Sequence, residues 1–205
     1  FAALTSGDAN IAIGFSALNA NTSGSFNTAV GHFALDACVS DSNNTGIGAL
    51  ALEVCVGSGN TAVGSSALAK NTSATNNTAV GLNALDAATT GGANTAVGKD
   101  ALGDLTTGSE NTGVGWTAGG DITTARFCTA VGRQALRQNT TTEYLTAVGY
   151  SAMRSTTGAS NTGVGNSALY TNVGGVGNTA VGDSSLYSNS AGNRNTAIGF
   201  RAGHG

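Results

Sequence analysis

The stretch Asn178-Thr179-Ala180-Val181-Gly182 decides the fold, because near-copies of it run through the whole chain. Twelve copies are present, and their closing glycines stand at positions 14, 31, 48, 64, 81, 98, 115, 132, 149, 165, 182 and 199. Nine of the eleven intervals are 17 residues long, and two are 16. A period of this length indicates a repeat architecture in which each unit contacts mainly its neighbours.

Each position of the repeat accepts few residue types. The first is Asn in ten of the twelve copies, with Cys128 and Leu145 as the exceptions, and the second is Thr in eleven. The third is always Ala or Gly, the fourth always Val or Ile, and Gly closes every copy. Three and four residues later come Ala and then Leu or Met in most copies, followed by a polar segment.

This pattern predicts an all-β fold. Thr-Ala-Val is β-prone, and its alternation places Thr and Val on one face and Ala on the other. We expect Ala-Leu and its neighbours to form a second short strand, with turns at the glycine and in the polar segment. Each repeat would then be one coil of a parallel β-solenoid of about twelve coils, spanning residues 1–205. The Asn column, including Asn60, Asn77 and Asn94, would form a stacked amide ladder along the rod.

A single coil buries too little apolar surface to stand alone, so the columns of the repeat suggest packing between chains. A homo-oligomer would allow the same columns to pack on themselves along the whole rod. We expect small Ala and Gly residues inside the coil, and Val with Leu facing neighbouring chains. The interface column would contain Val30, Val63, Val80, Val97, Val131 and Val181.

Composition excludes several classes of protein. The net charge is −3 and only 9% of residues are charged, so neither disorder nor nucleic-acid binding is expected. No run of 18 apolar residues occurs, so membrane insertion is not expected either. Near the start of the sequence, Ala3-Leu4 fits the end of an earlier repeat, and near its end, Ala202-Gly203 lies inside another repeat. We therefore expect a segment of a longer fibre.

Catalytic and metal-binding patterns are lacking. The two histidines, His32 and His204, lie far apart in coil number, and no nucleophile–base set or metal-ligand spacing stands near them. We expect no enzyme activity, no cofactor and no metal. Cys38 and Cys55 each follow a closing glycine by seven residues, which would stack them on adjacent coils. They are either two small buried residues in one column, which the sequence favours, or a disulfide.

Recognition residues are best sought in the column directly after the closing glycine, which varies most widely and should face solvent. Its members Trp116, Arg133 and Tyr150 fall on successive coils and form a candidate recognition patch. The alternative is an unconstrained surface column. Arg126 and Arg137 belong to an Arg-rich stretch, 126–154, that would either bind an acidic glycan or fill a gap in packing around Cys128 and Leu145.

The unit Gly-x-x-Ala-Leu followed by Asn-Thr-Ala-Val-Gly resembles the head repeats of YadA-type trimeric autotransporter adhesins, and more closely the Asn-Thr-Ala-[Ile/Val]-Gly-x-x-Ala-Leu arrays of phage and bacterial tail-fibre-like proteins. This resemblance covers residues 3–203 and implies a left-handed β-roll of three chains on a virion or cell surface, attached to a host glycan or protein. The 17-residue period is longer than the usual head repeat.

A structural and adhesive fibre, foremost a bacteriophage tail fibre, is therefore the predicted function. A bacterial surface adhesin or extracellular filament is the alternative of the same class. The Thr column also permits an ice-binding solenoid, although each strand carries one Thr rather than a Thr-x-Thr array. A polysaccharide depolymerase is the enzymatic alternative, and it would require clustered carboxylates on one face.

Overall fold

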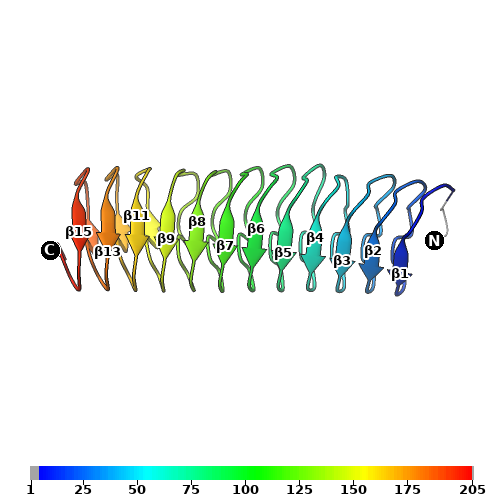
Figure 1. Ribbon diagram of the computed structural model, residues 1–205, viewed down its shortest axis with the longest axis horizontal. Helices are drawn as coiled ribbons and strands as arrows, with labels where there is room; N and C mark the ends of the chain where they lie inside the picture. The colour runs from blue at the N-terminus through cyan, green and yellow to red at the C-terminus, as the bar shows by residue number, and fades with distance from the viewer. Residues whose placement is uncertain (1–4, 205) are drawn as a thin grey trace.

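The computed structural model describes residues 5–204 and forms a straight β-solenoid of about eleven turns (Figure 1). No helix occurs among these residues. One strand per coil joins a twelve-stranded parallel sheet that runs the length of the rod. Its strands are β1 (Ile11–Ile13), β2 (Thr28–Val30), β3 (Thr45–Ile47), β4 (Thr61–Val63), β5 (Thr78–Val80), β6 (Thr95–Val97), β7 (Thr112–Val114), β8 (Thr129–Val131), β9 (Thr146–Val148), β11 (Thr162–Val164), β13 (Thr179–Val181) and β15 (Thr196–Ile198).

The sheet has one register throughout. Thr pairs with Thr, Ala or Gly with Ala or Gly, and Val or Ile with Val or Ile between successive coils, as at β5 and β6. The 16-residue coils keep this register, because β3 pairs with β4 and β9 pairs with β11 position for position. The predicted parallel solenoid with its period of 17 residues is therefore confirmed. Ala3 and Leu4, taken above as the end of an earlier repeat, lie outside the described residues.

The prediction of a second strand at Ala-Leu in each coil is wrong. Ala101 and Leu102 lie in a turn, with left-handed φ values of 53° at Asp100 and 47° at Leu102. In a strand, adjacent residues point to opposite faces, so only one of Ala and Leu could be buried. The turn lets both side chains point inward. A second, three-stranded sheet forms only near the C-terminus and further along the coil; its strands are β10 (Ser155–Thr156), β12 (Thr171–Asn172) and β14 (Ser188–Asn189).

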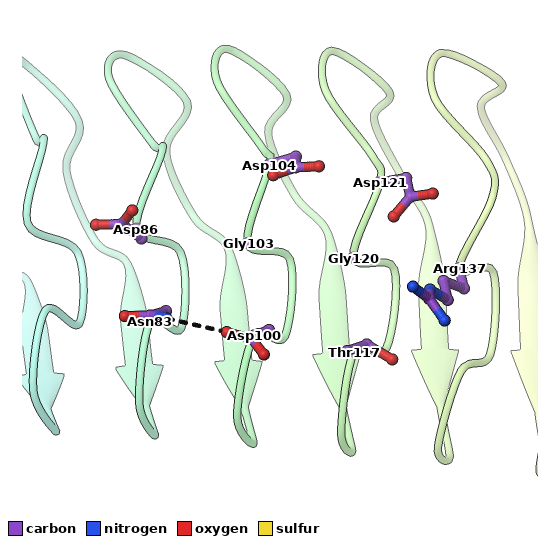
Figure 2. A pocket seen from close by; sticks show the side chains of 9 residues that line it. All are labelled: Asn83, Asp86, Asp100, Gly103, Asp104, Thr117, Gly120, Asp121 and Arg137. Carbon is purple, nitrogen blue, oxygen red and sulfur yellow. Dashed lines mark hydrogen bonds between the residues drawn. The ribbon is translucent and has the colours of Figure 1, made fainter.

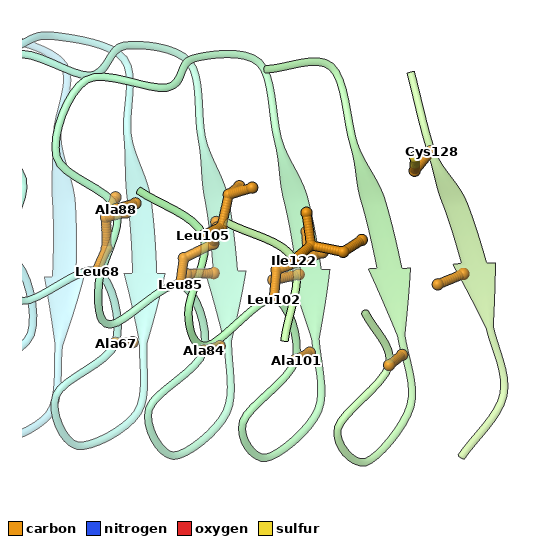
Figure 3. Close-up of a cluster of buried hydrophobic side chains, with 14 of the residues drawn as sticks. Ala67, Leu68, Ala84, Leu85, Ala88, Ala101, Leu102, Leu105, Ile122 and Cys128 are labelled. Carbon is orange, nitrogen blue, oxygen red and sulfur yellow. The ribbon is translucent and has the colours of Figure 1, made fainter. Parts of the chain in front are cut away.

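The core lies inside the coil itself. Ala96, in the middle of β6, is fully buried, as are Ala101 and Leu102 in the turn that follows. Figure 3 shows the Leu column, with Leu68, Leu85 and Leu102 following one another from left to right along the rod inside the solenoid. The expectation that Leu faces neighbouring chains is therefore wrong. Leu is the large residue that fills the space between the strand and the opposite wall.

The Asn column is also internal. The Oδ1 atom of Asn60 accepts a hydrogen bond from the backbone N–H of Asn77 at 3.0 Å, and Asn77 does the same for Asn94 at 2.8 Å. The Nδ2 atom of every column Asn except Asn195 donates to a carbonyl in the polar turn, as Asn77 does to Gly91 at 2.9 Å. The predicted amide ladder thus exists mainly as side chain to backbone bonds, which satisfy backbone groups that the short strands leave unpaired.

Candidate functional site

The outer face of the twelve-stranded sheet carries the Thr and Val columns. Thr95 and its equivalents are half-buried by their neighbours on the sheet, except on the two end strands, where Ile11 and Thr196 are exposed; Val97 is 36% exposed. The other members of the interface column predicted from the sequence also lie on this face and are half-buried: Val30, Val63, Val80, Val131 and Val181. Ile13 and Ile198, on the two end strands, are 62% and 72% exposed. The result is a continuous apolar and hydroxyl-bearing stripe outside a core that is already filled.

The column after the closing glycine is exposed at all twelve positions, as a recognition column must be. Within it, the guanidinium of Arg133 lies 4.4 Å from the centre of the Trp116 ring and 5.7 Å from that of Tyr150. These separations fit cation–π contacts on both sides of the guanidinium. The structure therefore brings the three predicted recognition residues together as one ladder at the turn after the sheet.

The other arginines of the 126–154 stretch do not join that ladder. Arg126 lies in the polar turn before β8, whereas Arg133 follows β8, so the strand separates them. Arg126 contacts Phe127, whose ring stacks on Tyr144 with the centroids 5.2 Å apart. The adjacent Cys128 and Leu145, which replace the ladder Asn, are buried. The burial of Cys128 and Leu145 fits the alternative that this stretch fills a gap in packing. The arginines of the stretch do not form one continuous patch.

Arg137 lies on the wall opposite the sheet, at one end of a surface slot with a volume of about 310 Å³. Figure 2 shows Gly103 and Gly120 along this slot, with Asp86 near the other end. Asp104 and Asp121 line one side; Asn83, Asp100 and Thr117 line the other.

The two glycines are what opens the slot. Their column carries Asp86 and Arg137 in the flanking coils. A Cβ atom on Gly103 would lie 3.4 Å from its nearest neighbour, and one on Gly120 would lie 3.3 Å away. Neither backbone has the left-handed φ that demands glycine. Gly103 leaves room for a Cβ atom, and Gly120 would need only a small shift of the Thr117 carbonyl, so the slot is a local feature of these two coils.

Charges around the slot are partly compensated. Lys70 pairs with Asp86 at 3.0 Å, and Lys99 with Asp100 at 3.5 Å. Asp121 keeps no salt bridge within 4 Å among residues 5–204. Burial raises the pKa of its carboxyl above the usual value, and the nearby Arg137 partly offsets that rise. The slot is thus mildly acidic, with one guanidinium at its end.

A second aromatic ladder, which was not predicted from the sequence, lies near the C-terminal end of the rod. Tyr170 and Tyr187 stack with their ring centres 5.0 Å apart, and Tyr187 contacts His204 edge to face. Arg154 Nη1 donates a hydrogen bond of 2.6 Å to the Tyr170 hydroxyl. These residues share the column of Arg137 and the slot glycines. The 17-residue period places these residues in one column, and that period is the sequence signal that predicts the ladder.

Features of catalytic or metal sites are not assembled in the described part of the chain. His32 stacks on Phe15 with the ring centres 5.5 Å apart, and His204 packs on Tyr187. No group of three or more His, Cys, Asp or Glu side chains within residues 5–204 is arranged to hold a metal ion. Over the same residues, there is no apolar helix long enough to cross a bilayer.

Comparison with known proteins returned no match to a protein-family model, to a curated protein or to a solved structure.

Proposed function

We propose that the chain serves as a rigid spacer and host-attachment module in a homotrimeric surface fibre, foremost a bacteriophage tail fibre. One observation carries the proposal. The Thr and Val columns form an outward stripe along the whole sheet, although the coil has already filled its own core. The strand propensity of Val and Ile accounts for part of this pattern, and burial against neighbouring copies would account for an apolar residue at every repeat of an exposed face.

Apolar stripes of this length on a soluble protein are characteristic of interfaces. Three parallel copies, turned about a common axis, would bury the same columns against each other in every coil. Such symmetry makes each favourable contact recur along the rod. The similarity of the repeat to trimeric adhesin heads and tail-fibre-like arrays supports three chains over two. A bacterial surface adhesin or extracellular filament would use the same architecture.

Attachment requires residues that remain exposed when the sheet faces are covered. In the proposed trimer, the ladder of Trp116, Arg133 and Tyr150 would meet this condition, since it is exposed in the single chain and lies in the turn beyond the sheet. Its aromatic rings and guanidinium are typical of binding hot spots. We assign to this ladder the binding of a host-surface glycan or protein, at the virion or bacterial cell surface.

Assembly is tested by one pair of substitutions in a single coil. Val97→Asp puts a charge into the proposed interface, whereas Lys99→Asp changes an exposed residue two positions further on. Neither side chain belongs to the coil's own core. Sedimentation velocity should show trimers for the Lys99→Asp variant and folded monomers for Val97→Asp. Equal assembly of the two variants would contradict the proposed interface.

Ice binding is the second candidate function, and the outward Thr column favours it. Eleven Thr residues stand at one position of a straight parallel sheet, spaced by the distance between strands. In this case the chain would remain monomeric and its stripe would contact ice instead of protein. Measured thermal hysteresis in a monomeric preparation, abolished by charged substitutions on the Thr column, would support this candidate over the fibre.

A further inference from the structure

The interior column seven residues after the closing glycine contains two cysteines in succession. Cys38 and Cys55 are both fully buried, and their Sγ atoms are 2.9 Å apart. This separation is shorter than the usual contact between two sulfur atoms that are not bonded. We propose that Cys38 and Cys55 form a disulfide that covalently joins two adjacent coils in the mature protein.

The backbone already holds the two coils at a suitable distance. Next to the pair, the N–H of Ala37 donates to the carbonyl of Glu53 at 3.0 Å, which links the two coils directly. Chains joined in this way run about 4.8 Å apart. Disulfides span Cα separations of roughly 4.4–6.8 Å. Only a small side-chain adjustment is therefore needed to form the bond.

The cysteines occupy a position where Asn elsewhere ties down the polar turn. Asn71, in the next coil, accepts a hydrogen bond of 2.6 Å from the Ala74 N–H and donates one of 3.0 Å to the Ala74 carbonyl. Cys38 has only a weak contact of 3.8 Å with the Asp41 carbonyl. A disulfide would restore to these two coils a restraint that the Asn residues give to others.

Cys38 and Cys55 are the only two of the three cysteines that lie close enough to pair. Cys128, the third cysteine, lies in the Asn column at the start of a strand, several coils away. The side-chain hydrogen bond with Cys38, together with burial, raises the pKa of the Cys55 thiol, so few thiolates form once the coil is closed. We therefore expect the bond to form as these coils fold. Afterwards, both sulfurs are shielded from attack by other thiols.

Bond formation is a two-electron oxidation. The two S–H bonds break, one S–S bond forms, and two protons are released. The two electrons pass to the disulfide of a thiol–disulfide oxidoreductase or, during refolding, to glutathione disulfide, which is reduced to two thiols. The reaction follows the usual exchange route through a mixed disulfide.

The test is a thiol count on the chain refolded with oxidised and reduced glutathione, then denatured without reductant and treated with iodoacetamide. We expect one alkylated cysteine, Cys128, an intact mass lower by two hydrogens before alkylation, and a non-reduced peptide that contains both Cys38 and Cys55. Three alkylated cysteines would overturn the proposal. So would a linked peptide that contains Cys128.

Two variants give an independent readout. The Cys38→Ser/Cys55→Ser double variant removes the bond, and Cys128→Ser is the matched control. Unfolding and refolding in reductant, which keeps the bond from forming, should lower the melting temperature of the wild type and of the control by roughly 6–12 °C relative to protein refolded with glutathione disulfide, which is the effect expected for closing a loop of this size. It should leave the double variant unchanged. An equal response to reductant in all three proteins would overturn the proposal, and the thiol count decides the matter if the double variant does not fold.

Discussion

The amide oxygen of Asn94 accepts a hydrogen bond of 2.9 Å from the backbone N–H of Asn111, one coil further along the rod. The same side chain donates to the Gly108 carbonyl at 3.0 Å, in the polar turn of its neighbour. One side chain thus fixes both the axial spacing and the turn. The repeated Asn is therefore a structural residue and is not part of an exposed binding surface.

Asn94→Ala should destabilise the solenoid by about 2–5 kcal/mol, because it leaves the Asn111 N–H and the Gly108 carbonyl buried without partners. Denaturant unfolding followed by circular dichroism measures this loss. Asn19→Ala, at an exposed position, is the control and should change the free energy of unfolding by less than about 0.5 kcal/mol. Equal effects of the two substitutions would show that the ladder carries no stability.

The closing glycines should tolerate no side chain. Gly98 has a φ of +131°, and a Cβ atom there would lie 2.6 Å from the Gly115 carbonyl oxygen. Gly98→Ala should therefore cost at least about 2 kcal/mol in the free energy of unfolding.

Gly103→Ala is the matched control in the same coil. Its Cβ would meet no atom closer than 3.4 Å, and its φ is not left-handed. Replacing Gly by Ala at such a position usually stabilises by up to about 1 kcal/mol, because the unfolded chain loses freedom. A Gly103→Ala variant as unstable as Gly98→Ala would contradict the view that Gly103 serves only to open the slot.

The slot predicts a pH effect on stability. Burial raises the pKa of Asp121 in the folded state. The folded chain therefore binds a proton at this carboxyl more tightly than the unfolded chain does. The favourable contribution of Asp121 is then complete below the unfolded pKa and is lost as pH rises through the folded pKa. Asp121→Asn should raise the melting temperature at pH 7, and the difference from wild type should vanish near about pH 3.

Asp183 provides a control of opposite sign. A hydrogen bond from Asn166 lowers the pKa of this exposed carboxyl, and Ser184 contributes a second. Its contribution is present above the unfolded pKa and is lost as pH falls through the folded pKa. Asp183→Asn should slightly lower the melting temperature at pH 7, and the difference from wild type should shrink as the pH falls through the folded pKa. Shifts of the same sign for both variants at pH 7 would refute the assignment.

The recognition ladder is tested by binding. Trp116→Ala and Arg133→Ala should each weaken attachment of the chain to host-cell surfaces by 10-fold or more, since hot-spot residues contribute about 1.4 kcal/mol or more each. Ser65→Ala, in the same exposed column several coils away, is the control. Attachment to labelled cells, measured by flow cytometry, should fall for the first two variants only. If all three variants attach like wild type, the ladder is only a surface column.

Much of the fold could be predicted from the sequence because each column of the repeat has one environment. Ala96 and its equivalents are inward, and Val97 is outward, as alternation along a strand requires. Leu102 was misplaced because its burial depends on the left-handed turn that begins at Asp100, and a pattern of residue types does not reveal φ.

The candidate sites were only partly predictable, for a similar reason. Trp116, Arg133 and Tyr150 could be grouped because the period aligns them in a variable column. The slot could not be predicted, because it results from the missing side chains at Gly103 and Gly120. Glycine in a repeat usually indicates a turn, and only the φ values and Cβ distances distinguish a glycine that shapes the backbone from one that leaves space.

The central claim is that the outward Val and Thr stripe is an interface between three copies of the chain. Multi-angle light scattering of the purified protein, followed through serial dilution, tests it most directly. We predict a stable mass of three chains that the Val97→Asp substitution reduces to one. A folded wild-type monomer at every concentration would contradict the claim, because the stripe would then remain exposed.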